Sequence, residues 1–229
     1  MKSLSFYRIF SVIAIAVTLT GCMFDYTPAS LKEESHRPIV LAVAYDVSKS
    51  TQGAVPEITP FIIDTLLSLV RHRTGEFGFT TIGEAKPRMI SLRFMSENGD
   101  IREHSRRQQL NDRQLSRVRR VVYECIRERS DIHTRLFDSI ELSLTFLSEP
   151  HLPADADKYL VVVSDFDDDM RLPEQRQPLQ VPENITVLAL GAEPLTIEKV
   201  LTPAPNVIAY TSLDGIIHYL NQERHHEQQ

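Results

Sequence analysis

The stretch IVLAVAY, residues Ile39–Tyr45, runs directly into DVSKS, residues Asp46–Ser50, and decides the fold. Seven apolar residues in a row, β-branched at the start, predict a strand that is buried on both faces. Such strands belong to sheets covered by helices on each side, and ligands bind outside the carboxyl ends of their strands. The polar residues after Tyr45 therefore leave the strand where a binding site is expected.

The polar turn places oxygen-bearing side chains at alternate positions, namely Asp46, Ser48 and Ser50. With this spacing in a tight loop, all of these side chains can face one point. Carboxylate and hydroxyl oxygens are hard ligands that suit a cation such as Mg²⁺. The turn is therefore a candidate metal site, with Mg²⁺ or Mn²⁺ as the expected ion.

Further along the chain, segments with the features of strands alternate with segments that have the helical spacing of apolar residues. This alternation predicts an α/β fold with a doubly wound, mostly parallel sheet and helices on both faces. The link between the second and third strands is too short for a parallel crossover, so one antiparallel edge strand is expected. The expected later strands are Glu76–Ile82, Arg88–Met95, Tyr159–Ser164, Ile185–Leu190 and Asn206–Tyr210; the expected helices begin at Pro60 and cover about Asp112–Arg127, Arg135–Leu147, Thr196–Leu201 and Leu213–Asn221.

The first residues have the features of a targeting segment rather than of a folded domain. Lys2 and Arg8 precede an apolar core, Ile9–Val17, which is short for a membrane-spanning helix. The sequence Leu-Thr-Gly-Cys that ends at Cys22 resembles the bacterial lipobox. This resemblance implies a signal peptide over 1–21, cleavage before Cys22 and lipid on that cysteine. A plain membrane anchor is the weaker alternative.

The expected location follows from this segment. Residues 22–37 are polar and predict a tether between the lipid and a domain over 38–222, while the tail 223–229 is expected to be disordered. Met23 follows the cysteine, whereas the inner-membrane retention signal of enteric bacteria is an aspartate there. The sequence therefore predicts a lipid-anchored envelope protein, with the outer membrane favoured in a Gram-negative host.

Charge and cysteine content exclude several classes of protein. A formal net charge of −6 argues against a dedicated nucleic-acid binder. The segment Asp100–Ser130 is rich in arginine, but acidic residues interleave, so a solvated helix face is favoured over a lipid-headgroup or nucleic-acid patch. With Cys22 carrying lipid, Cys125 has no partner in the chain, so a buried free thiol is expected and zinc–thiolate sites are excluded.

Two later positions complete the candidate site. Thr134 precedes the expected helix Arg135–Leu147, and Asp165 follows the expected strand Tyr159–Ser164. In this order, and with the first motif at the end of a buried strand, these residues resemble the metal-ion-dependent adhesion site of the von Willebrand factor A (VWA, or integrin I-like) domain. The resemblance covers roughly Pro38 to Leu220. It implies a Rossmann-like VWA fold and no catalytic residues.

The resemblance also implies how the site works. The hydroxyls of Ser48 and Ser50 would bind the metal directly, with Thr134 joining in at least one state. Asp46 and Asp165 would act directly or through water, and an acidic side chain of a protein partner would fill the remaining position.

Departures from the family pattern occur in the two supporting loops. His133 and Phe166 stand where the family often has glycine. Phe166 and Asp167 are the candidate partner-binding residues next to the metal. Asp167 also opens an acidic run that ends at Asp169.

Three functions are weighed on these grounds. The favoured hypothesis is a lipid-anchored interaction module that binds a protein partner through its metal ion. In the second, the protein is a structural component of an envelope or secretion assembly, and the metal only braces the loops. The third, a phosphotransfer-type hydrolase, is disfavoured because Ser48 stands where such enzymes need a second aspartate, and no G-x-S-x-G, H-E-x-x-H or P-loop motif is present.

Overall fold

A computed structural model describes residues 37–49, 51–83, 86–97, 100–128, 135–167 and 177–226, and it describes only the backbone of residues 223–226. The elements follow in the order β1 (Ile39–Asp46), α1 (Pro60–His72), β2 (Glu76–Ile82), β3 (Ile90–Arg93), α2 (Ile101–Arg127), α3 (Leu136–Leu147), β4 (Asp157–Val163), β5 (Ile185–Leu190), α4 (Pro194–Ile197), β6 (Val207–Tyr210) and α5 (Leu213–His226). None of the helices in these ranges combines the length and apolar character needed to cross a membrane.

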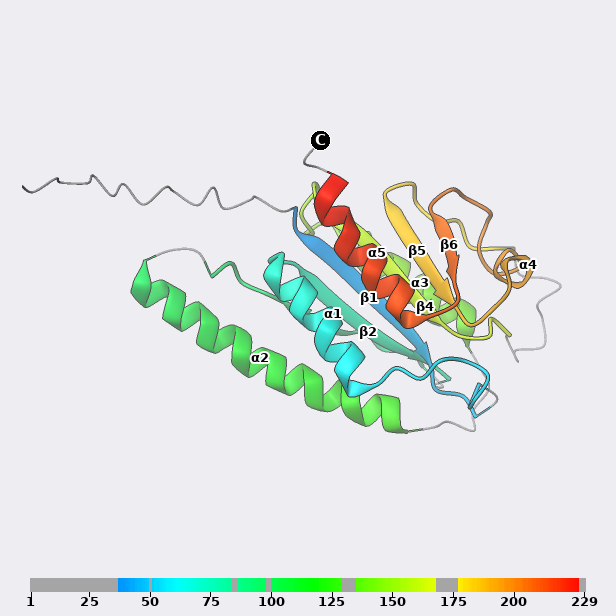
Figure 1. Cartoon of the computed structure of the whole chain (residues 1–229), viewed down its shortest axis with the longest axis horizontal. Helices are drawn as coiled ribbons and strands as arrows, with labels where there is room; N and C mark the ends of the chain where they lie inside the picture. The colour runs from blue at the N-terminus through cyan, green and yellow to red at the C-terminus, as the bar shows by residue number, and fades with distance from the viewer. Residues whose placement is uncertain are drawn as a thin grey trace, which may run out of the picture. The chain divides into compact units, whose positions relative to one another are not determined.

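The strands form one sheet in the order β3-β2-β1-β4-β5-β6 (Figure 1). All neighbouring strands are parallel except β2 and β3, which pair antiparallel at one edge. The predicted doubly wound, mostly parallel sheet with one antiparallel edge strand is thereby confirmed. The element order is also the one that the resemblance to VWA domains implied.

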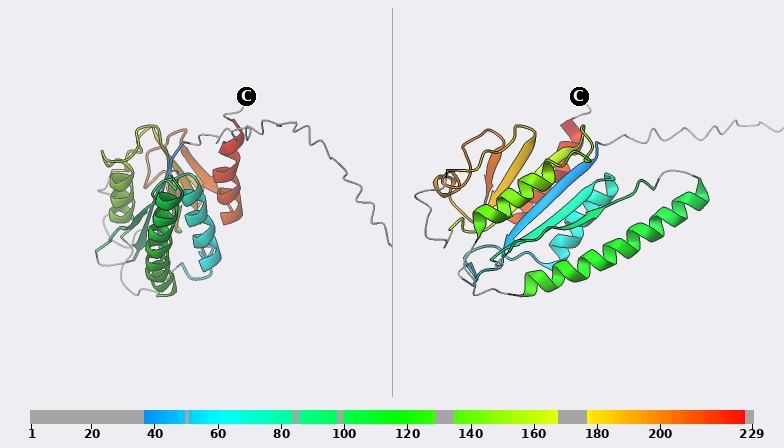
Figure 2. Two further views of the ribbon diagram at one scale, coloured as in Figure 1. Left: turned by 90° about the vertical axis from the view of Figure 1, so that its left-hand side faces the viewer. Right: turned by 180° about the vertical axis from the view of Figure 1, so that it is seen from behind.

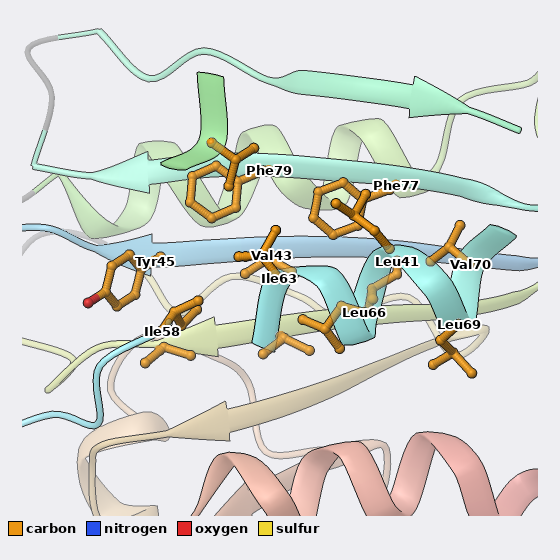
Figure 3. Close-up of a cluster of buried hydrophobic side chains, with 14 of the residues drawn as sticks. Leu41, Val43, Tyr45, Ile58, Ile63, Leu66, Leu69, Val70, Phe77 and Phe79 are labelled. Atoms are coloured by element: carbon orange, nitrogen blue, oxygen red, sulfur yellow. The ribbon is translucent and has the colours of Figure 1, made fainter. Parts of the chain in front are cut away.

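Helices cover both faces of the sheet (Figure 2). β1 is buried along its whole length, so alternate side chains enter two separate cores. Leu41, Val43 and Tyr45 face the core beneath α1, α2 and α5, and Figure 3 shows them packed against α1 and β2. Val40, Ala42 and Ala44 face the other core, beneath α3. The central position of β1 fixes where its polar carboxyl end emerges.

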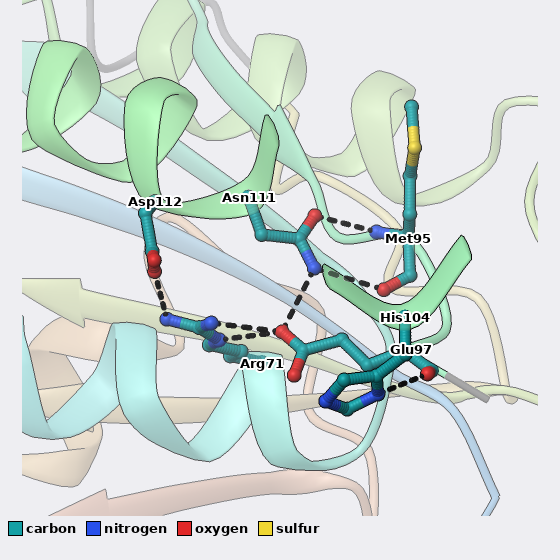
Figure 4. A network of polar contacts seen from close by, with 6 residues as sticks. All are labelled: Arg71, Met95, Glu97, His104, Asn111 and Asp112. Carbon is teal, nitrogen blue, oxygen red and sulfur yellow. Dashed lines mark hydrogen bonds and ion pairs between the residues drawn. The ribbon is translucent and has the colours of Figure 1, made fainter. Parts of the chain in front are cut away.

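A polar network joins the first half of α2 to α1 and to the segment after β3 (Figure 4). The fully buried side chain of Asn111 accepts a hydrogen bond from Met95 N (3.0 Å), donates to Met95 O (3.0 Å) and donates to Glu97 Oε1 (3.1 Å). Arg71 of α1 donates to Glu97 (2.8 Å) and to Asp112 (2.7 Å). Burial on its own would raise the pKa of Glu97, but the hydrogen bonds from Asn111 and Arg71, together with the charge of Arg71, lower it.

Several element boundaries differ from the sequence prediction. α2 begins at Ile101, not near Asp112, because the carboxylate of Asp100 accepts the N–H groups of Arg102 and Glu103 and caps the helix there. The strand expected over Arg88–Met95 is limited to Ile90–Arg93. The helix expected over Thr196–Leu201 lies earlier, at Pro194–Ile197, where Pro194 provides the fixed φ angle of a first helical position. The last helix continues past Asn221 to His226.

Candidate metal and partner site

The candidate site lies where the direction of the sheet order reverses. From β1 the chain first builds outward through β2, whereas β4, on the other side of β1, leads to β5 and β6. The register pairs Tyr45 with Val163, so the residues that follow these two strands emerge side by side. Asp46 and Asp165 therefore meet at the reversal point of a doubly wound sheet, where ligands bind in this architecture.

Asp46 is buried, with 1% of its surface exposed, and both of its carboxylate oxygens accept hydrogen bonds. Oδ1 accepts the backbone N–H of Ser48 (2.9 Å) and Oδ2 accepts the hydroxyl of Ser164 (2.7 Å). Two donors on opposite oxygens fix the orientation of the carboxylate.

The loop after β1 is held by its own hydroxyl groups. The N–H of Val47 donates to Ile82 O of β2 (3.0 Å), which extends the pairing beyond the strand. Thr51 is buried and donates its hydroxyl to Ser48 O (2.9 Å), while the hydroxyl of Ser48 lies 3.5 Å from that of Thr51. The turn thus brings a carboxylate and two hydroxyl groups into a space with little access to solvent.

Asp165 is the second carboxylate of the site. Burial is the main reason why its pKa is raised, the N–H of Asp167 (3.1 Å from Oδ1) opposes the shift, and the negative charges of Asp46 and Asp167 add to it. Burial and the two neighbouring carboxylates thus both disfavour the ionised form of Asp165. A bound cation favours the ionised carboxylates.

Part of the predicted ligand set lies outside the described residues. Ser50 and Thr134 are among these positions, as is the expected lipidation site Cys22, so the structure describes Asp46, Ser48 and Asp165 of the predicted set. Within the described ranges, no three His, Cys, Asp or Glu side chains form a group that could hold a metal. The predicted site depends on hydroxyl ligands instead, and the described part fits a hard cation by the chemistry of its oxygens.

Phe166 does not line a binding surface, contrary to the prediction. Its ring is 3% exposed and lies in the core beneath α3, with Leu136 and Phe137. Its backbone has φ 60°, the left-handed region that favours glycine, which is the residue the family often has here. The physical reason is that this turn directs the side chain back under the sheet rather than out to solvent. Asp167, the other predicted partner-binding residue, is exposed at the site.

Gly191, at the end of β5, closes the far side of the site. It has φ 108°, and a Cβ atom at this position would lie 2.5 Å from Ser164 O and 2.9 Å from Val55 Cγ1. The absence of a side chain lets the β5 turn approach both the β4 loop and the loop after β1. A side chain here would push apart the two loops that carry Asp46 and Asp165.

Sequence reasoning missed the roles of Ser164 and Thr51. Ser164 is fully buried, donates to Asp46 and accepts the N–H of Phe166 (3.1 Å), so one hydroxyl links the two loops. The available signal was a serine at the last position of an apolar run.

A groove of about 1050 Å³ lies elsewhere, between β3 and α2, and its lining residues include none of the site residues.

No family model matches the sequence, and no curated protein matches it. Among solved structures, proximal thread matrix protein 1 from the mussel byssus is similar at 14% identity over 82% of this chain and 47% of its own length, with a TM-score of 0.44. A further structure of that protein has a zinc-occupied MIDAS motif. The pilus adhesin SpaC from Lactobacillus rhamnosus GG (11% identity, 82% and 29% coverage, TM-score 0.47) and the SpRpn10 VWA domain (10%, 81% and 94%, 0.37) are also similar.

These similarities concern the chain path alone. The chain spans about half the length of the mussel protein and under a third of the adhesin, by the coverage of 47% and 29%. The chemistry of the site therefore rests on its own residues.

Proposed function

We propose that this chain is a lipid-anchored envelope protein with a VWA-like domain that binds a divalent cation and, through the cation, a protein partner. The observation that carries the proposal is the meeting of Asp46 and Asp165 at the reversal point of the sheet, with hydroxyl groups on both loops. Asp46, Ser48 and Asp165, with Ser50 and Thr134, would hold Mg²⁺ or Mn²⁺. When bound, the cation supplies an electron-poor site for an acidic side chain.

The chain's own residues prepare this site. The hydrogen bonds from Ser48 N and Ser164 Oγ orient Asp46 before any cation binds. Neutral hydroxyl ligands leave more positive charge on the cation than carboxylates would, which favours a carboxylate from outside the chain. The proposed activity is binding, and no catalytic group is invoked.

The cation is tested by thermal unfolding and by calorimetric titration of the purified chain with Mg²⁺ and Mn²⁺. A ligand that binds only the folded state raises stability by about 2.7 kcal/mol at a hundred times its Kd. We expect this gain in the wild type and in Asp155→Asn, an exposed aspartate on the turn before β4. Asp46→Asn and Asp165→Asn should lose it. A wild type that neither ion stabilises would contradict the site.

The partner is tested by capture from envelope extract, with and without EDTA. Capture that needs the divalent ion, and that fails with Asp46→Asn but not with Asp155→Asn, supports the interaction module. Equal capture in EDTA and with Asp46→Asn would favour the structural alternative, in which the metal only braces the loops. The anchor is tested separately, by the mass of the peptide that contains Cys22 and by its change in Cys22→Ser.

A further inference from the structure

Six of the arginines of α2 lie on one side of the helix. Arg106, Arg113, Arg120 and Arg127 follow one another at intervals of seven residues, which returns each to nearly the same side of an α-helix. Arg102 and Arg117 lie one turn from members of this series and therefore on the same side. All of these residues are exposed, and the buried residues Leu115, Val118, Val122 and Ile126 face the opposite way. We call these six arginines the arginine stripe.

The arginine stripe differs from the other arginines of α2 in its ion pairs. Arg107 pairs with Glu103 at 3.2 Å and Arg119 lies 2.6 Å from Asp64 of α1, so the two arginines that flank the buried side are compensated. Within the part of the chain that the structure describes, no stripe arginine has an ion pair. α2 carries eight arginines against three acidic residues, a net +5 in a chain of net −6.

The length and the outer position of α2 allow the arginine stripe to contact a flat surface. From Arg102 to Arg127 the stripe extends over about 38 Å of a continuous helix, at 1.5 Å per residue. α2 is the outermost element on its flank of the sheet (Figures 1 and 2), so a flat surface can touch the stripe along its length. Guanidinium groups bind phosphate through paired hydrogen bonds, and the remaining acidic surface of the domain is repelled by the same phosphates. Such a molecule adopts one orientation on an anionic surface.

We propose that the arginine stripe docks the domain on a membrane surface that carries anionic phospholipid. The choice of a lipid surface over another polyanion rests on the proposed lipid anchor, because a tether over 22–37 of about 50 Å when fully extended keeps α2 close to the bilayer. The contact is electrostatic and peripheral. The stripe includes none of the residues that follow the carboxyl ends of β1 and β4.

Arginine footprinting tests this orientation on the full chain. The protein is reconstituted in vesicles of phosphatidylcholine, with or without phosphatidylglycerol, and treated with phenylglyoxal, which modifies accessible arginines. We expect the stripe arginines to react several times more slowly when phosphatidylglycerol is present. Arg88, which is exposed in the segment before β3 and does not line the groove that contains Arg117, should react equally in both and serves as the control inside the same molecule. High salt should remove the difference. Equal modification of the stripe in both vesicles would overturn the proposal.

Matched variants separate the stripe from total charge. Arg106→Gln, Arg113→Gln and Arg120→Gln together should weaken the contact by about 100-fold, since each basic residue near an anionic surface contributes about tenfold or less. Arg102, Arg117 and Arg127 should then lose their protection. Lys86→Gln, Arg88→Gln and Lys199→Gln remove the same charge from exposed positions away from α2 and should leave the protection intact. Equal loss of protection in both triple variants would show an effect of net charge and would overturn the proposal that the stripe makes the contact.

Two further outcomes distinguish the neighbouring hypotheses. Protection of the stripe by duplex DNA in place of phosphatidylglycerol, at the same salt concentration, would overturn the lipid assignment. If the peptide with Cys22 carries no lipid, the anchor of the proposed function fails. In that case the chain is added to preformed vesicles and footprinted again. This experiment still tests whether the stripe binds the anionic surface, because protection of its arginines there requires only phosphatidylglycerol.

Discussion

At the scale of single residues, Phe166 shows how the candidate site departs from the pattern of the VWA domains that the sequence resembles. The left-handed backbone at this position costs a residue with a Cβ atom about 1 kcal/mol relative to glycine. The buried ring compensates by filling the core beneath α3. The turn geometry is therefore kept even though the residue that usually makes it is absent.

This balance predicts an inverted order of stability for two substitutions. Phe166→Ala should lower the free energy of unfolding by about 3–5 kcal/mol, because it empties the core. Phe166→Gly should cost about 1 kcal/mol less than alanine, because glycine adopts the positive φ without strain. Urea unfolding measures both. At Ile140, in the middle of α3 and fully buried, the order should be the ordinary one, with glycine the worse substitution. Alanine equal to or better than glycine at Phe166 would refute this account.

At the scale of elements, the first part of α2 depends on a buried polar side chain. Asn111 faces the interior where a leucine or valine would be expected from the helical spacing, and it binds both backbone groups of Met95. Met95 follows the edge strand β3, so the amide of Asn111 occupies the place that a neighbouring strand would take. This contact fixes α2 against the sheet.

Asn111→Ala should therefore lower the free energy of unfolding by about 2–4 kcal/mol, since it leaves the N–H and C=O of Met95 without their protein partner. The change is measured by urea unfolding, with an unchanged m-value as the sign that the folded state stays compact. Gln109→Ala, at an exposed position of the same helix, should change stability by no more than about 0.5 kcal/mol. A small effect at Asn111 would show that the network in Figure 4 is dispensable.

The elements also show what the sequence could and could not predict. β1 and β4 were predictable because they contain the unbroken apolar runs Ile39–Tyr45 and Tyr159–Val163, and Asp46 and Asp165 are the first charged residues after those runs. The first turns of α2 were not predictable, because Arg102–Asn111 has almost no apolar residues to mark a helical period. Its cap, Asp100, and its buried anchor, Asn111, are both polar and resemble loop residues in the sequence.

At the scale of the whole molecule, the site lies on a seam between two halves of the sheet. β1, β2 and β3 lie on one side with α1 and α2, and β4, β5 and β6 lie on the other. The hydroxyl of Ser164 crosses this seam to Asp46 (2.7 Å), and this contact was not predictable from the sequence because it depends on the register between β1 and β4. The hydrogen bond joins the halves at the same point where it orients the proposed ligand.

Ser164→Ala should therefore affect stability and cation binding together. It leaves the buried Oδ2 of Asp46 without this donor, which should cost about 1–3 kcal/mol of unfolding free energy. It should also weaken Mg²⁺ or Mn²⁺ binding in calorimetric titration, because the carboxylate loses its fixed orientation. Ser143→Ala is the matched control, since Ser143 is equally buried but donates to Ser139 O within α3 (2.8 Å). That variant should keep the affinity for the cation. Unchanged affinity in Ser164→Ala would show that the hydrogen bond to Asp46 stabilises the fold but does not contribute to cation binding.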